Sequence, residues 1–575
     1  MRNFKYILKK LMVQNRLPCA ETIFLVILLS GLQLYLPILF QQFIDGIAER
    51  FAVSQMMRIL AMYFVVSVAI YGVGLWKDWE ATRAAWKGTD SLRKEIVEKI
   101  LSYDQRFFQE RNAGQVIESL ENDLNEMENF IQCTLIPIFM NVLSMIGIIF
   151  VFWKENKWIA MMFALFIMAS LYIIYLQQKQ DSDIILRERK SHAEVIAFES
   201  EIIENRKVIT LAGKRANVLS RLEKIIRQRI PLKVDLQKYY YRVWIITLSL
   251  LAGVNILSLF LGGALYFRHM ISLGMVYLMY SYGNMLKQPF EELQMHIQNF
   301  LAAKGSSEKL ADLLLYKSGV TDGPVKEMDP FSELILEDVC FAYGNKAVLN
   351  HACMKISRGM KVGIFGQSGA GKSTISKLLC KILEPQEGKI LINGKDIRLY
   401  SSETVRNAFA YVSAGNLIFE SSLRDNLTIY NEKINDEAIL TVLEGLGIAK
   451  YFSFMKGKAG KKLLDMPIGR QMVSNGEAQL LNLCRLFFVD KQVIIFDEAS
   501  SVIDETVEES FHQIFRKLTK NVTTIMITHH VERLSDCDYV YTIHMGNVIE
   551  EGKPGELKLQ EYSLFNKYAE RIWES

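Results

Sequence analysis

A glycine-rich segment at residues 366–373 has the composition and spacing of a phosphate-binding loop. It follows the apolar run 362–365 and reads Gly366-Gln367-Ser368-Gly369-Ala370-Gly371-Lys372-Ser373. Glycines let backbone N–H groups surround phosphate oxygens, the lysine reaches the β- and γ-phosphates, and the serine hydroxyl is an oxygen ligand for Mg²⁺. Because a helical pattern follows, we predict a nucleoside triphosphate site over this loop and Thr374, with Ser373 as a metal ligand.

Two carboxylates follow a second apolar run, 493–496, further along the chain. A buried strand that ends in two acids delivers both side chains to one edge of a sheet. We predict that Asp497 holds Mg²⁺ through water and that Glu498 polarises the attacking water. An apolar strand that ends in Asp-Glu is common by itself, so this prediction depends on the phosphate-binding loop that precedes it.

A histidine pair, His529-His530, follows a third apolar run at 523–528. A lone histidine is usually structural. Here the strand end would lie beside the phosphate site, which favours His529 as a sensor of the γ-phosphate.

The elements that would position these residues differ between the two parts of the chain. After residue 331, short β-type runs alternate with helical patterns, which is typical of an α/β domain with a largely parallel sheet. Before it lie six apolar stretches, at about 22–44, 57–76, 132–153, 158–176, 243–266 and 270–287, close to the roughly 20 residues of a membrane-spanning helix. The sixth is the weakest, because it is short and contains Ser281 and Asn284.

The sequence therefore predicts an all-α, six-helix transmembrane domain followed by an α/β P-loop NTPase domain. We expect the first domain at residues 1–315, a Gly- and Ser-containing linker at 316–330, and the second domain at 331–575. The long connections between spans two and three and between spans four and five hold about 23 lysines and arginines, so they and both termini are predicted to be cytoplasmic. The basic, amphipathic start fits an interfacial helix better than a signal peptide.

Composition excludes several classes of protein. Of the 575 residues, 50% are hydrophobic and 23% are charged, which argues against a disordered chain. The net charge of +4 argues against a nucleic-acid binder. The 7 cysteines form no CxxC pair, which suits a reducing compartment better than a disulfide framework.

With these motifs in this order, the chain resembles the ATP-binding cassette transporters, specifically their exporter-type half-transporters, over essentially its whole length. Further matches are Tyr343 as an adenine-stacking ring, Ser474 and Gly476 in the signature, and Asp504 in the D-loop. Residues 107–123 are similar to the first coupling segment. The resemblance implies ATP with Mg²⁺, and a second half-transporter whose signature completes each ATP site.

Three positions depart from the family pattern. The signature has Asn475 in place of a glycine; asparagine tolerates a positive φ, so the turn is expected to survive, with a side chain added where backbone approaches phosphate. Ala414 occupies the position of a glutamine that helps to hold Mg²⁺. The segment 468–472 before the signature looks short. A heterodimer with one degenerate site is favoured over a homodimer, although Ala414 weakens the side that would be active.

We predict a bacterial-style inner-membrane exporter subunit, surrounded by lipid, that moves a hydrophobic or amphipathic drug, lipid or modified peptide. The predicted spans hold polar residues but no obvious charge cluster; the polar residues are Gln33, Gln41, Gln42, Asn141 and Asn255. Two alternatives stay open. One is a non-transporting, nucleotide-binding regulatory subunit, and the other is an importer of metal chelates with the same fold.

Overall fold

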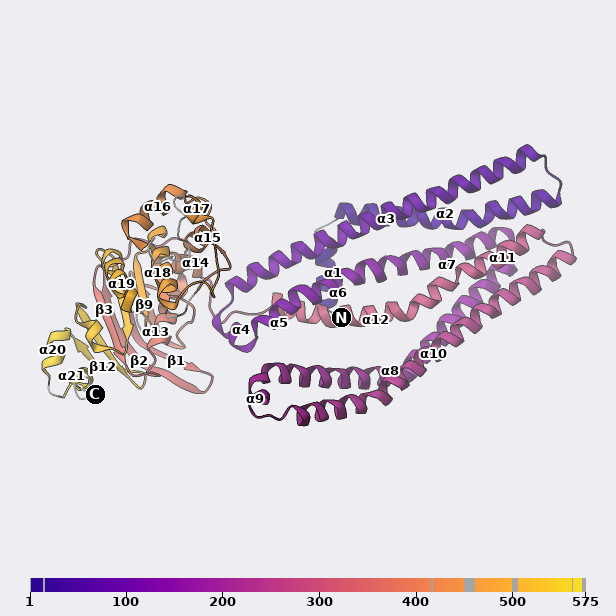
Figure 1. Ribbon diagram of the computed structural model, residues 1–575. Coiled ribbons are helices and arrows are strands. Elements are labelled where there is room, and N and C mark those ends of the chain that lie inside the picture. Colours follow the sequence, from indigo (N-terminus) through magenta and orange to yellow (C-terminus); the bar gives the residue numbers. More distant parts are fainter. Residues whose placement is uncertain are drawn as a thin grey trace. The chain divides into compact units, whose positions relative to one another are not determined.

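The computed structural model describes residues 2–13, 16–413, 415, 417–448, 461–498, 505–560 and 562–570. The chain forms two compact units (Figure 1). The helical unit consists of Met1–Leu101 and Ala113–Tyr316, and the sheet unit consists of Ser102–Asn112 and Lys317–Ser575. The predicted order, a helical region followed by an α/β domain, is confirmed.

The helical unit consists of long helices joined by short turns. Two π-helical turns, Ser119–Asp123 and Ile131–Leu135, join α5, α6 and α7 into one continuous helical stretch. The helices are α1 Arg2–Val13, α2 Arg16–Ala48, α3 Val53–Ser102, α5 Ala113–Glu118, α6 Leu124–Phe130, α7 Ile136–Glu155, α8 Lys157–Glu204, α9 Arg206–Leu211, α10 Arg215–Phe267, α11 Leu273–Met285 and α12 Lys287–Leu314.

Four helical stretches among the described residues are long and apolar enough to cross a membrane: Arg16–Ala48, Val53–Ser102, Ala113–Glu155 and Arg215–Phe267. The fourth predicted span lies in α8, whose shorter apolar part is Lys157–Ile173. The sixth is divided between α11 and α12 at Leu286. Large apolar side chains along these stretches are exposed, such as Phe260 at 73%, as expected of surfaces that face lipid.

The start of α11 is fixed by a carboxylate from α2. Asp45 accepts hydrogen bonds from Ser272 Oγ at 2.8 Å and from the Gly274 backbone N–H at 2.7 Å. A Cβ atom at Gly274 would lie 2.4 Å from the Gln41 carbonyl oxygen, so only glycine permits this approach of the two helices. The contact joins the first predicted span to the sixth.

The sheet unit contains two larger sheets with helices packed on them. Its helices are α4 Gln105–Glu110, α13 Lys372–Leu379, α14 Ser402–Ala408, α15 Leu423–Thr428, α16 Asp436–Gly445, α17 Lys461–Leu464, α18 Asn475–Arg485, α19 Glu505–Leu518, α20 Pro554–Leu559 and α21 Leu564–Glu570. Its strands are β1 Glu333–Tyr343, β2 Lys346–Ser357, β3 Lys361–Gly366, β4 Glu387–Ile392, β5 Lys395–Asp396, β6 Phe409–Ser413, β7 Ser421–Ser422, β8 Pro467–Ile468, β9 Val493–Asp497, β10 Thr523–Thr528, β11 Tyr539–His544 and β12 Asn547–Gly552.

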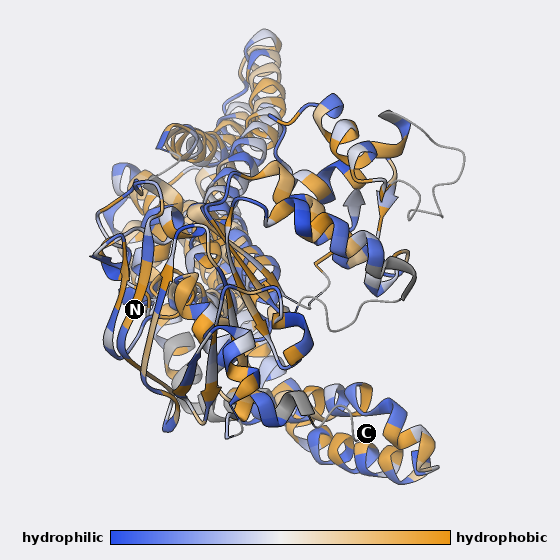
Figure 2. Ribbon diagram, turned by 90° about the vertical axis from the view of Figure 1, so that its left-hand side faces the viewer, coloured by the Kyte–Doolittle hydropathy of each residue, from blue (hydrophilic) through white to orange (hydrophobic). Residues whose placement is uncertain are grey.

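The six-stranded sheet has the order β12-β11-β3-β10-β9-β6 and is parallel except for the β11–β12 hairpin. Its central strands β3, β9 and β10 are largely buried, as continuous apolar runs in a parallel sheet should be. Because they run in the same direction, the residues that follow them meet at one edge. Helices of this unit show apolar and polar residues in alternating patches, and their apolar faces cover the sheet (Figure 2).

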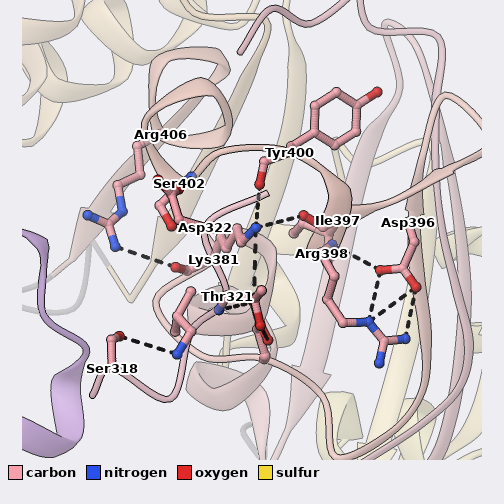
Figure 3. Close-up of polar contacts among 12 residues, drawn as sticks. Ser318, Thr321, Asp322, Lys381, Asp396, Ile397, Arg398, Tyr400, Ser402 and Arg406 are labelled. Atoms are coloured by element: carbon pink, nitrogen blue, oxygen red, sulfur yellow. Dashed lines mark hydrogen bonds and ion pairs between the residues drawn. The ribbon is translucent and has the colours of Figure 1, made fainter. Parts of the chain in front are cut away.

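Residues 318–325 belong to the sheet unit and are held in it by hydrogen bonds (Figure 3). Glu384 accepts from Thr321 N–H at 2.7 Å, and Asp322 accepts from Ser402 N–H at 2.8 Å. Beneath them the fully buried Lys381 ammonium donates to the carbonyl oxygens of Ile397, at 2.9 Å, and of Tyr400. This amine fixes the turn on which residues 318–325 lie, so the expected linker is ordered at this point.

Candidate nucleotide-binding site

A cavity of about 620 Å³ opens at the edge of the six-stranded sheet where β3 and β9 end. The predicted phosphate loop forms one wall, and Tyr343 lies among the other lining residues. The lining residues are Tyr343, Lys346, Ala347, Val348, Ser368, Gly369, Gly371, Lys372, Ser373, Thr374, Glu498, Met545 and Gly546. The structure thus brings Tyr343, the loop and Glu498 to one cavity, although they are far apart in the sequence.

The phosphate loop is shaped by glycines at positions where other residues would be strained or would clash. Gly371 precedes α13 with φ at 105°, a left-handed conformation that L side chains rarely adopt. A Cβ atom at Gly366 would lie 2.3 Å from the Ile543 carbonyl oxygen. The loop therefore passes close to β11 and turns sharply into α13, which directs the start of that helix toward the cavity.

Lys372 is the first residue of α13, and its side chain is 5% exposed. Its ammonium group donates to the carbonyl oxygens of Gly366 at 2.7 Å and Gln367 at 2.9 Å. Burial lowers the pKa of this ammonium, while the nearby Glu498 and Asp497 carboxylates oppose that shift. The amine is thus held within the loop, beside the two acids that the sequence predicted.

Asp497 ends β9 and is 6% exposed. Its Oδ1 accepts a hydrogen bond from Ser373 Oγ at 3.3 Å. Its Oδ2 accepts from Ser376 Oγ at 3.1 Å and from the Tyr411 hydroxyl at 2.9 Å. Burial raises the pKa of Tyr411, and the Asp497 carboxylate raises it further, so the phenol stays protonated and donates. Ser376 and Tyr411 were not predicted as site residues.

Glu498 follows β9 with an uncommon φ of 51° for a residue other than glycine. Its backbone N–H donates to Ile527 O at 2.9 Å, which joins the ends of β9 and β10. Its carboxylate Oε1 lies 3.0 Å from His529 Nδ1. The two residues that the sequence predicted at separate strand ends are therefore in direct contact.

Lys346 and Gly546 also line the cavity and were not predicted as site residues. Lys346 pairs with Tyr343 across the turn between β1 and β2. The Gly344-Asn345 turn signal could have placed Lys346 there. Gly546 donates its N–H to Ala370 O at 3.2 Å, and a Cβ atom on it would lie 2.5 Å from Val348 O. Its turn packs directly on the phosphate loop.

The predicted signature residues lie at the start of α18 and are not among the residues that line this cavity. Ser474 caps the helix: its Oγ accepts from Glu477 N–H at 3.2 Å, and Glu477 accepts from Ser474 N–H at 2.8 Å. The prediction of a positive φ at Asn475 was wrong. Its φ is not positive, because Asn475 is the first residue of a right-handed helix. Asp504 and Ala414 lie outside the described residues.

Comparisons with known proteins agree with this architecture. Residues 20–290 match the family model of the ABC transporter transmembrane region, and residues 349–501 match the family model described as ABC transporter. An uncharacterized ABC transporter ATP-binding protein of Bacillus subtilis is 21% identical over 531 residues, which cover 90% of this chain and 85% of that protein. An ATP-dependent lipid A-core flippase of Desulfotalea psychrophila is 30% identical over 272 residues, which cover 45% of this chain and 46% of that protein.

A solved structure of a bacterial Atm1-family ABC exporter with ATP bound superposes with a TM-score of 0.80. It is 19% identical and covers 97% of this chain and 98% of its own, so the likeness concerns the fold. The two family models, matched in succession along the chain, and this fold point to the same conclusion. The chain belongs to the ABC transporters, and it has the exporter-type arrangement of a transmembrane region followed by an ATP-binding domain in one polypeptide.

Proposed function

We propose that this chain is one half of an ATP-driven exporter, which binds ATP at the phosphate loop and hydrolyses it with Glu498 as general base. One observation carries the proposal. A buried amine, Lys372, one strand-end acid, Glu498, and an aromatic ring, Tyr343, line one cavity. The second strand-end acid, Asp497, lies next to this lining, with Oδ1 3.3 Å from Ser373 Oγ. Together these residues provide a cation that binds the phosphates, a metal ligand, a general base and an aromatic surface for the adenine.

Each residue has a chemical role in this proposal. The loop N–H groups and Lys372 bind the phosphates, and the Tyr343 ring stacks on the adenine. Glu498 accepts a proton from the attacking water. His529, 3.0 Å away, orients Glu498 through Nδ1 and leaves Nε2 to contact the γ-phosphate.

The residues present fit Mg²⁺. Ser373 Oγ and Asp497 Oδ1 lie 3.3 Å apart, and hydroxyl and carboxylate oxygens are the ligands that Mg²⁺ takes beside phosphates. When bound, the ion neutralises charge on the phosphates. Ser373 would contact it directly, and Asp497 would hold it through water.

We propose that two such half-transporters close on two ATP molecules and turn the membrane cavity outward. ATP acts by favouring the closed state over the open one. The ATPase domain and both termini lie on the cytoplasmic side of an inner membrane, because connections rich in lysine and arginine remain on that side. Hydrolysis by Glu498 then resets the pair.

The cargo we propose is amphipathic rather than purely hydrophobic. A cavity of about 830 Å³ in the helical unit is lined by polar and apolar side chains, including Gln33, Asn141, Lys77, Lys287 and Glu292. Glu292 accepts from Gln288 Nε2 at 2.8 Å and from Asn141 Nδ2 at 3.5 Å. Lys77 follows directly after the second predicted span, Lys287 ends the sixth and Glu292 lies beyond it, so no single predicted span contains all three. Both signs of charge suit a polar head with an apolar body.

ATP hydrolysis by the purified chain in lipid nanodiscs tests the proposed function. We expect Mg²⁺-dependent turnover that amphipathic compounds stimulate more than purely hydrophobic ones, either by the chain alone or after addition of a second half-transporter. ATP binding without turnover in both preparations would support the regulatory alternative. ATP-dependent uptake of cargo by inside-out vesicles, rather than its release, separates an exporter from an importer.

The degenerate signature gives a prediction about the partner. Asn475 presents a side chain at the start of α18, where the partner's phosphate would approach. We expect Asn475→Gly to raise turnover of the chain alone by about 10-fold, equivalent to about 1.4 kcal/mol, the energy of one recovered hydrogen bond. Asn475→Ala, which keeps Cβ, is the control and should give a smaller gain. Equal turnover in all three proteins would show that the signature does not limit a homodimer.

A further inference from the structure

Tyr411 occupies the middle of β6, beside β9 in the parallel sheet. Ser413, two residues on, pairs with Asp497, so Tyr411 and Ser413 share the face on which Asp497 lies. The Tyr411 hydroxyl donates to Asp497 Oδ2 at 2.9 Å, while Oδ1 remains turned to Ser373 at 3.3 Å. Tyr411 therefore contacts the carboxylate oxygen other than the one that Ser373 contacts, and this oxygen also accepts from Ser376 Oγ at 3.1 Å.

The ring of Tyr411 lines a second cavity, of about 630 Å³, with residues from the segment 102–112. Tyr103, Gln105 and Phe108 form one wall of it, and Lys377 and Arg406 belong to the other wall. In the sequence, this segment lies between membrane helices. It nevertheless belongs to the sheet unit.

The segment 102–112 is fixed within the sheet unit by Asp104. This carboxylate caps α4 by accepting from Phe107 N–H at 3.2 Å, and it accepts from Gly319 N–H at 2.5 Å. Asp104 is 3% exposed, and Phe107 is fully buried. The wall of the second cavity that bears Phe108 is thus anchored, and Tyr411 is a single side chain between that cavity and Asp497.

We propose that Tyr411 is a positioning residue that orients Asp497 toward the metal and makes metal affinity depend on the segment 102–112. The inference rests on the proposed function, because it takes Asp497 as the carboxylate that holds Mg²⁺. Outer hydrogen-bond partners of metal-binding carboxylates commonly change metal affinity by about 10-fold or more. The Tyr411 hydroxyl contacts Asp497, and its side chain lines the cavity that residues of the segment 102–112 also line.

The first test is Tyr411→Phe, which removes one hydroxyl. Mn²⁺ affinity is measured by electron paramagnetic resonance on the full chain in nanodiscs with a non-hydrolysable ATP analogue. We expect about 10-fold weaker Mn²⁺ binding, with unchanged affinity for the analogue in EDTA. Tyr541→Phe is the matched control, since its hydroxyl contacts only the Lys355 backbone among the hydrogen bonds described, at 2.9 Å, and it should bind Mn²⁺ as the wild type does.

The second test is Phe108→Ala, which alters the wall of the cavity without touching the carboxylate. We expect it to change Mn²⁺ affinity about threefold when Tyr411 is present and to have no further effect in Tyr411→Phe, because coupled residues are not additive. Equal effects in both backgrounds would overturn the link to the segment. Unchanged Mn²⁺ affinity in Tyr411→Phe would overturn the positioning role. Wild-type chain that binds the analogue without Mn²⁺ would instead contradict the proposed metal site itself.

Discussion

Glu498→Gln is expected to lower ATP turnover by at least about 100-fold while leaving ATP affinity within twofold of the wild type. Glu498 lines the cavity, and its Oε1 lies 3.0 Å from His529 Nδ1. The amide has the same shape but cannot accept the proton of the attacking water. Binding depends on the loop and Lys372, which this substitution leaves in place.

Steady-state hydrolysis and equilibrium binding of a fluorescent ATP analogue, both in nanodiscs, measure the two effects separately. Glu509→Gln, an exposed residue of α19 outside the cavity, is the matched control and should behave as the wild type does. Because Glu498→Gln blocks hydrolysis but not binding, ATP should remain bound to this variant during a chase with unlabelled nucleotide. Turnover within a few-fold of the wild type would remove Glu498 from the role of base.

The strand-end residues of the ATP site were predictable because a parallel sheet leaves little freedom. Three apolar runs, each followed by a polar group, must end at one edge once they pair in parallel, and β3, β9 and β10 do so. The register then sets Asp497 and Glu498 beside the phosphate loop. The contact between Glu498 and His529 follows from this topology and needs no further signal in the sequence.

Other features depend on tertiary packing that no local pattern encodes. Tyr411 reads as an ordinary strand residue, and only the pairing of β6 with β9 brings its hydroxyl to Asp497. The charged lining of the helical cavity was not predicted, because Lys77 and Glu292 lie outside the apolar stretches and Lys287 is the last residue of the sixth. The sequence pattern predicted a turn with a positive φ at Asn475, whereas the capping box between Ser474 and Glu477 makes Asn475 the first residue of a helix. Residues 102–112 likewise belong to the sheet unit through contacts with residues far away in the sequence, which no local pattern predicts.

Lys372→Ala is expected to weaken ATP binding by about 100-fold and to abolish turnover. A charge-assisted hydrogen bond contributes about 1.5–3 kcal/mol, and 1.4 kcal/mol corresponds to a tenfold change in affinity. Lys372 is 5% exposed and its ammonium lies within the loop, whereas Lys346, the other lysine of the cavity lining, lies beside Tyr343 at the turn between β1 and β2. Lys389→Ala, an exposed residue of β4 away from the cavity, is the control and should bind ATP normally.

The pH dependence of binding gives a second measurement on the same residue. Burial lowers the pKa of the Lys372 ammonium below its usual range, although Glu498 and Asp497 oppose the shift. The charged form binds phosphate, so the affinity of the wild type should fall as the pH rises toward that lowered pKa, and Lys372→Ala should lose this fall. An affinity that depends on alkaline pH in the same way in both proteins would assign the titration to another group.

Lys372→Ala and Glu498→Gln together separate a transporter from a regulatory subunit. The first substitution removes nucleotide occupancy, and the second keeps occupancy but removes hydrolysis. An exporter that must reset by hydrolysis fails with either substitution. A subunit that acts only through bound ATP works with Glu498→Gln and fails with Lys372→Ala. Export of an amphipathic dye from cells that carry each variant distinguishes these patterns. Both residues line the same cavity, so the two variants differ in whether nucleotide binding or hydrolysis is lost.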